Sequence, residues 1–176
     1  MNRAATLGVS PYMRVWTAVV TLLGLLAVAG CAAAADTSAG YDQADVRFNQ
    51  QMIIHHRQTI QLAELAADRS SSSYVRELSK KLIAAEQADI QKMSEWLKSW
   101  QQPVPAEEPS QEATELRAGP GFDRGWLTVL SRHLEHGIHM AKEVQTSGKH
   151  EPTRLLADRI VREQGEELAT IADRLD

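Results

Sequence analysis

The sequence is poor in cysteine and aromatic residues, and its longest helical stretch lacks proline and glycine. Cys31 is the only cysteine among 176 residues, so no disulfide can form within the chain. Aromatic residues make up 5% of the chain, and no alternation of apolar and polar residues typical of half-buried strands occurs. Neither Gly nor Pro occurs from Asp42 to Arg69. These absences exclude a disulfide scaffold and a metal site built on several thiolates, and they favour helices.

Sequence motifs of several enzyme classes are also missing. The chain has no Gly-rich phosphate loop, no His-Glu-x-x-His and no nucleophile constellation. Carboxylate-rich di-iron sites use Glu-x-x-His pairs, and no such pair occurs in the sequence. We therefore expect no catalytic residues and rank an oxidoreductase low.

The first thirty residues have the composition of an export signal. Arg3 and Arg14 are their only charged residues, and an apolar run extends from residue 15 to 29. Val28-Ala29-Gly30-Cys31 resembles a lipoprotein cleavage box, so residues 1–30 are predicted to be a signal peptide and Cys31 the lipid-bearing, palmitoylated residue. The alternative is an uncleaved anchor, although the run is shorter than the roughly 20 residues a spanning helix needs. Met13 is an alternative start.

Lipid on Cys31 would place the protein at the cell membrane, on its extracytoplasmic face. Residues 31–40 would be a tether of small residues that reaches about 30 Å at most. The signal contains two of the 19 basic residues and no acidic one, so the mature chain has 17 basic and 23 acidic side chains, a formal charge of −6. This charge argues against nucleic acid as a partner and leaves membrane attachment to the lipid.

The remainder of the chain predicts an all-α domain, an antiparallel four-helix bundle. Two helical hairpins, residues 41–100 and 122–176, are joined by a Pro-rich connection at 101–121. The polar residues Ser70 to Ser73 separate the first two helices, and Gly148 and Pro152 mark the boundary between the last two. Each hairpin has an apolar stripe that can be buried only against the other hairpin.

The two hairpins are similar to each other at a fixed offset of 78 residues. The offset matches apolar positions with apolar positions, and it pairs Asp45 with Asp123 and His55 with His133. A duplicated hairpin is the simplest explanation. The exceptions are Met52, His56 and Met93, which correspond to Leu130, Leu134 and Ile171. The second copy thus retains apolar packing residues and loses soft metal donors.

The first helix has the strongest candidate ligands. Met52 lies one turn before His55 and His56, so a thioether and an imidazole share a face, while Met93 and Glu86 lie on the stripe of the second helix. Thioether and imidazole together suit copper, Cu(I) in particular. A methionine on a stripe is, however, usually a core residue, and a buried histidine is often structural. Glu86 fits a ligand, a histidine partner or a surface residue equally well.

Candidate donors also occur on the third helix. His133, His136 and Met140 repeat at separations of three and four residues, so they share one helix face. His136, together with His139 and His150, is nevertheless expected on the solvent face. The sequence therefore leaves open which of these residues approach the first hairpin.

The chain resembles a known family in these same residues. The motifs are Phe48-x3-Met52-x2-His55-His56-x3-Ile60-x2-Ala63 and Gln87-x-Asp89-Ile90-x2-Met93-x2-Trp96-Leu97. They are similar to the signature of the domain of unknown function 305 family. That resemblance implies an exported, often lipid-anchored, ferritin-like four-helix protein, some members being associated with copper. It also implies Met52, His55, His56 and Met93 as metal positions, with His133 alone retained in the second half.

Two functional hypotheses follow. In the first, the protein binds copper without turnover, through the first-hairpin donors with His133, His136 or Met140 contributing, and buffers the metal or transfers it to an envelope copper-handling protein. In the second, the site is degenerate and the bundle is a structural or interaction module of the envelope. Trp96 and Trp100 would then either form a docking patch or close the end of the bundle.

Overall fold

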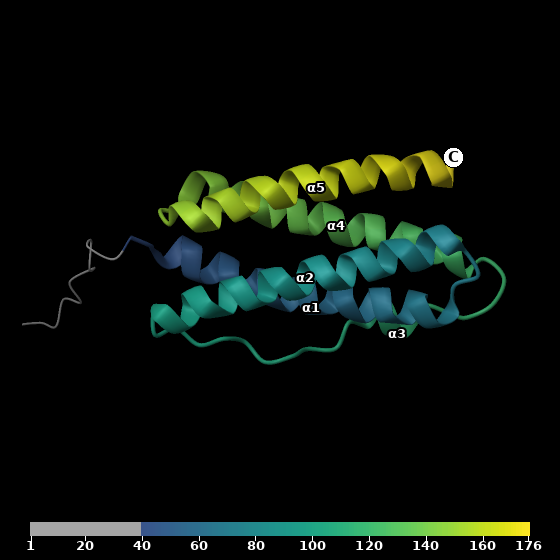
Figure 1. Ribbon diagram of the computed structural model, residues 1–176, viewed down its shortest axis with the longest axis horizontal. Coiled ribbons are helices and arrows are strands. Elements are labelled where there is room, and N and C mark those ends of the chain that lie inside the picture. Colours follow the sequence, from purple (N-terminus) through teal and green to yellow (C-terminus); the bar gives the residue numbers. More distant parts are fainter. Residues whose placement is uncertain (1–39) are drawn as a thin grey trace, which may run out of the picture. The chain divides into compact units, whose positions relative to one another are not determined.

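The computed structural model describes residues 40–176, so the predicted signal peptide, Cys31 and the tether up to residue 39 lie outside the described residues. The described part contains helices and no strand (Figure 1). Their bounds are α1 Gln43–Arg69, α2 Ser73–Ser99, α3 Gln111–Glu115, α4 Phe122–Ser147 and α5 Glu151–Leu175. The predicted all-α bundle is confirmed. In residues 40–176, no helix combines the length and apolarity needed to cross a membrane.

Local sequence signals determine where the long helices begin. Asp42 and Asp45 form a capping box at the start of α1, and Ser72 caps α2 by accepting a hydrogen bond from Val75 N. The ring of His150 caps α5, and Pro152 lies in the first turn of that helix, where a missing N–H costs nothing. His150 was expected to be exposed. It is half-buried because its ring packs edge-on against Trp96 and Trp100.

The order of the helices requires a long crossover. Each hairpin is antiparallel, and α2 ends at the end of the bundle opposite to the start of α4, so the connection runs back along α1 (Figure 1). One such crossover is characteristic of ferritin-like bundles. Several hydrogen bonds fix the crossover to α1; among them, Gln50 Nε2 donates to Pro103 O, Arg57 Nη1 to Pro105 O, and Ser110 N to Gln61 Oε1. Ser110 also caps α3, a short helix that the sequence did not predict.

Equivalent aspartates tie each hairpin to the turn of the other. Asp45 Oδ2 accepts hydrogen bonds from the backbone N–H groups of Lys149 and His150, both at 3.0 Å, at the start of α5. Asp123 Oδ2 accepts one from Ser72 N at 3.2 Å, at the start of α2. The two aspartates are 78 residues apart, as are the donors Ser72 and His150 in the two turns, so the offset seen in the sequence is present as approximate two-fold symmetry.

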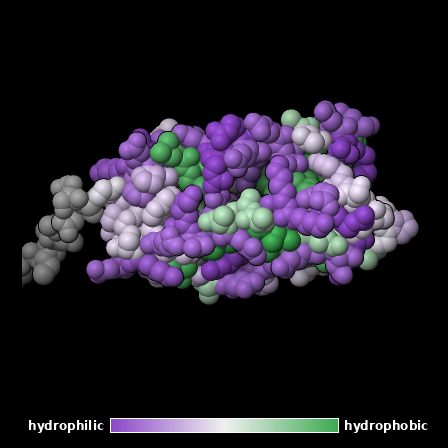
Figure 2. Space-filling view, viewed as in Figure 1, coloured by the Kyte–Doolittle hydropathy of each residue, from purple (hydrophilic) through white to green (hydrophobic). Residues whose placement is uncertain are grey.

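Two apolar clusters form the core of the bundle. One contains Met52, Met93 and Leu97, and the other contains Leu130 and Ile171. At one end Tyr41 stacks on Trp100 with ring centroids 4.3 Å apart, so the tryptophans pack against the core. Hydrophilic residues cover most of the face shown in Figure 2, with apolar residues in separate small areas.

Candidate metal-binding site

A buried polar layer separates the two apolar clusters. It consists of His55, His56, Thr59, Glu86, Asp89, His133 and Gln164, all of them buried and contributed by the four long helices. Burying a polar group costs free energy unless a partner compensates it. The layer is therefore the part of the core where a functional explanation is required.

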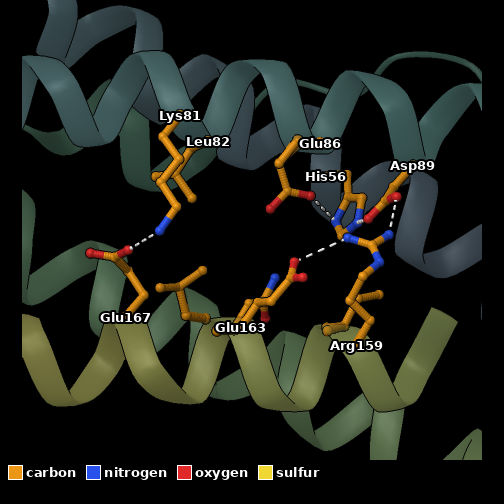
Figure 3. A pocket seen from close by; sticks show the side chains of 12 residues that line it. His56, Lys81, Leu82, Glu86, Asp89, Arg159, Glu163 and Glu167 are labelled. Atoms are coloured by element: carbon orange, nitrogen blue, oxygen red, sulfur yellow. Dashed lines mark hydrogen bonds and ion pairs between the residues drawn. The ribbon is translucent and has the colours of Figure 1, made fainter. Parts of the chain in front are cut away.

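His56 lies at the centre of a network of charged groups. Its exposed fraction is 1%, and its Nδ1 atom is 2.5 Å from Glu86 Oε2, with its Nε2 atom 3.7 Å from Asp89 Oδ2. These contacts are ion pairs, and their angles do not align as hydrogen bonds. Asp89 in turn pairs with Arg159 from α5 (Figure 3). Glu86 is thus a histidine partner, one of the three roles that the sequence left open.

The two carboxylates determine the protonation of His56. Burial alone would lower the pKa of His56, but the charges of Glu86 and Asp89 outweigh burial and raise this pKa from 6.5 to about 9. His56 is therefore an imidazolium at neutral pH. A metal ion could use its nitrogen only by replacing the proton.

His55 and His133, which are 78 residues apart, bind each other reciprocally. His55 Nε2 is 2.9 Å from His133 O, and His133 Nε2 is 3.2 Å from His55 O. Their rings stack with centroids 4.0 Å apart. His133 Nδ1 also contacts Glu112 Oε2 at 2.7 Å, so the crossover helix α3 contributes a carboxylate. Both adjacent histidines of α1 are buried.

The second nitrogen of His55 has no partner among the described residues. His55 is 3% exposed, and its Nδ1 atom makes no hydrogen bond there. Burial lowers the pKa of His55 well below 6.5, and the neighbouring His133 lowers it further. The ring fits because Gly137 has no side chain: a Cβ atom there would lie 2.8 Å from His55 Cε1. His55 is thus a neutral imidazole with one buried nitrogen unused.

Two methionines lie beside the charged network. In an antiparallel hairpin, residues whose numbers have the same sum lie at the same level along the axis. The residue numbers of Met52 and Met93 have the same sum as those of His56 and Asp89, so the two methionines lie opposite each other as His56 and Asp89 do. Met52 precedes His56 by four residues on α1, and Met93 follows Asp89 by four residues on α2. Both methionines are 0% exposed and belong to one apolar cluster. The α1–α2 seam therefore places two thioethers one turn from His56.

The structure divides the predicted ligands into two groups. His56 contacts α2 and lies one turn from the fully buried Met52 and Met93, whereas His55 and His133 meet between α1 and α4. His136 is exposed, with its ring centroid 5.7 Å from that of His55, and Met140 is half-buried against the apolar cluster of Met52. Within residues 40–176, no three His, Cys, Asp or Glu side chains are arranged to hold a metal ion.

Sequence reasoning missed four residues of the polar layer and its surroundings. Asp89 and Arg159 pair between α2 and α5, and Glu112 reaches His133 from α3. Gln164 occupies the position equivalent to Glu86, and its Oε1 atom is buried without a hydrogen-bond partner in the described chain. The offset of 78 was the signal that relates Gln164 to Glu86.

A small cavity opens beside His56, between α2 and α5. Its volume is about 50 Å³, and its lining includes His56, Glu86, Asp89, Arg159 and Gln164. Figure 3 shows charged side chains from α2 and α5 facing one another across it. The space is large enough for water or a single metal ion.

A family model covers most of the described chain. The model named "Domain of unknown function (DUF305)" matches residues 45–175. Among the curated proteins, none matches the chain significantly.

Solved structures of similar fold include two DUF305 proteins. One, from Streptomyces coelicolor and described as a candidate secreted protein, is 24% identical, with a TM-score of 0.67 over 75% of this chain and 90% of the other. The other, a fragment from Deinococcus radiodurans, is also 24% identical, with a TM-score of 0.69 over 76% and 96% of the two chains. At this identity the likeness supports the fold alone.

A third similar structure carries a metal. CopM in its Cu(I)-bound form is 26% identical to this chain, with a TM-score of 0.67 over 73% of this chain and 93% of that one. CopM has also been solved in Cu(II)-bound and silver-bound forms.

Proposed function

The chain belongs to the DUF305 family, and on that premise we propose that it binds copper, as Cu(I), in the α1–α2 seam of its bundle. Met52, Met93 and His56 would be the ligands. We further propose that binding occurs without turnover, and that the protein buffers copper at the cell surface or transfers it to an envelope copper-handling protein.

One observation carries this proposal: two fully buried thioethers lie at the same level of one hairpin, one turn from a buried imidazole. Thioether sulfur favours Cu(I) over hard divalent ions such as magnesium or calcium. An apolar pair of leucine and isoleucine would pack the same space, as Leu130 and Ile171 do in the second hairpin. Packing alone therefore does not require methionine here. The likeness to CopM supports copper as the ion.

The charged network suits an ion that replaces a proton. His56 carries a positive charge between Glu86 and Asp89, and a Cu(I) ion bound to its nitrogen would carry the same charge. The two carboxylates would then compensate the metal as they compensate the imidazolium. Exchange of one cation for another avoids leaving Glu86 buried without a counter-charge.

The proposed cellular location follows from the sequence. Lipid on Cys31 would anchor the protein at the extracytoplasmic face of the cell membrane, where it would meet copper before the ion enters the cell. The acidic mature chain would attract cations and would have no preference for nucleic acid.

A competition titration tests the proposal. The full chain, purified in detergent, is titrated with Cu(I) against a colorimetric chelator under anaerobic conditions, in parallel with Met52→Leu/Met93→Ile. This double variant copies the second hairpin, so its core should remain packed. His139→Gln, which changes an exposed histidine, is the matched control.

We expect tight binding by the wild type and the control, and at least roughly tenfold weaker binding by the double variant, because two soft ligands are lost. Equal, weak binding by all three proteins would contradict the proposal. That result would favour an envelope interaction module with a degenerate site.

A further inference from the structure

The cavity beside His56 is bounded by ion pairs that cross from α2 to α5. On one side Arg159 pairs with Asp89, and on the other Lys81 Nζ lies 2.9 Å from Glu167 Oε2 (Figure 3). His56 lines the cavity although it is 1% exposed. The cavity is thus a hollow between two helices that leads to the buried imidazole.

The opposite side of the polar layer is arranged differently. There the crossover is hydrogen-bonded along α1, and the cleft beneath it is lined by His133 and His136 instead of His56. The α2–α5 seam therefore offers His56 a direct path to solvent.

The cavity has the chemistry of a path for a cation. Four carboxylates line it, those of Glu86, Asp89, Glu163 and Glu167, and they outnumber the three cationic groups of the lining, His56, Lys81 and Arg159. Two buried oxygen atoms also belong to lining residues and have no hydrogen-bond partner among the described residues: Glu86 Oε2, which is ion-paired with His56, and Gln164 Oε1, which lies beside Gly137. Such oxygen atoms could replace part of the hydration shell of an ion as it passes.

Arg159 is placed to close this path. Its side chain is 30% exposed, and its guanidinium joins the buried carboxylate of Asp89 to Glu163, whose Oε2 atom lies 3.1 Å from Nη1. Glu163 is 49% exposed, so Arg159 can swing outward and remain paired with it. While Arg159 contacts Asp89, its charge also repels an incoming cation.

We propose that Cu(I) reaches and leaves His56 through the α2–α5 cavity and that Arg159 is the gate of this route. The inference rests on the proposed copper site and adds how the ion gains access to it. Arg159 is a gating residue and is not a ligand. Opening requires only that its contact with Asp89 break.

The test measures the rates of Cu(I) uptake and release together with the affinity for Cu(I). Cu(I) is delivered from its bicinchoninate complex to the full chain in detergent, and stopped-flow absorbance records uptake and, with excess chelator, release. Arg159→Gln removes the gate charge. Arg162→Gln is the matched control, since Arg162 lies on the same helix, is 61% exposed and also contacts Glu163, at 3.7 Å, without lining the cavity.

We expect Arg159→Gln to accelerate both uptake and release, roughly two- to fivefold as for the loss of a partly exposed ion pair. Arg162→Gln should behave as the wild type. Arg159→Lys retains a positive charge beside Asp89 but lacks the planar guanidinium group, so it should give intermediate rates. This variant replaces Arg159→Gln in the test if the glutamine variant does not fold.

Unchanged rates in the Arg159 variants, or equal acceleration by Arg162→Gln, would overturn the gate. The uptake of Cu(I) by the wild type distinguishes this result from a failure of the proposed function. If the wild type takes no Cu(I) from the chelator, the copper site itself is refuted and the gate with it.

Discussion

Exchanging the His56–Glu86 pair for its counterpart in the second hairpin tests the electrostatic account of the polar layer. Adding 78 to each number gives Leu134 and Gln164, which are buried in the same bundle. We expect His56→Leu alone and Glu86→Gln alone to be strongly destabilising. The double variant should lose much less unfolding free energy than the sum of the losses in the two single variants. It removes both charges and places in this position a pair that the fold already accommodates in the second hairpin.

The magnitude follows from the pKa of His56. Its rise from 6.5 to about 9 corresponds to roughly 3 kcal/mol of favourable interaction between the imidazolium and its surroundings in the folded state. Removing one partner of a buried ion pair typically costs about 3–5 kcal/mol, whereas replacing both is often close to neutral. A coupling energy of about 3 kcal/mol is therefore expected between the two substitutions.

Urea unfolding at pH 7 of the wild type, both single variants and the double variant measures this coupling. The control is a second cycle at Glu77 and Lys80, an exposed pair that should show no measurable coupling. A coupling below about 0.5 kcal/mol between His56 and Glu86 would mean that the substitutions act independently, and it would refute the reasoning.

Three further predictions concern packing, titration and capping, each measured by urea unfolding. Gly137→Ala should destabilise the fold by about 1–3 kcal/mol, because the new Cβ would lie 2.8 Å from the His55 ring. Gly165→Ala places its Cβ in open space and should stabilise the fold by about 0.5–1 kcal/mol. Equal effects of the two substitutions would contradict the close packing at Gly137. Stability should be greatest near pH 6.5. Below this pH, protonation of His55 in the unfolded chain favours unfolding, because the pKa of His55 is lowered in the folded state. Above this pH, the fold loses up to roughly 3 kcal/mol of stabilisation from the His56 imidazolium as the pH rises to about 9. A flat dependence of stability on pH would refute both assignments. Asp45→Asn should cost about 1–3 kcal/mol, because the buried carboxylate accepts hydrogen bonds from the start of α5, and an unchanged midpoint would contradict this role.

Local patterns and the internal repeat predicted the fold well. The stretch without Gly or Pro from Asp42 to Arg69 corresponds closely to α1, and the offset of 78 recurs in the reciprocal contacts of His55 with His133. These features succeed because helix boundaries and apolar stripes are local properties. The five-residue helix α3 was missed because it has no apolar stripe and depends on contacts with α1.

The candidate site was harder to predict because its neighbours come from other helices. The sequence identified His56 and Glu86, but the contact of Asp89 with Arg159 depends on how α5 packs against α2. The division of the histidines is likewise a tertiary property: adjacent residues on one helix point about 100° apart, so His55 meets α4 while His56 meets α2. Both are nevertheless buried, because α1 has neighbours on both of these sides.

X-ray absorption at the copper edge tests the proposed site most directly. The full chain is loaded with one equivalent of Cu(I), and its spectrum is compared with that of Met52→Leu/Met93→Ile. The account predicts sulfur and nitrogen neighbours around copper in the wild type, and loss of the sulfur contribution in the variant. Copper surrounded by nitrogen and oxygen alone in the wild type would contradict a site built on Met52, Met93 and His56.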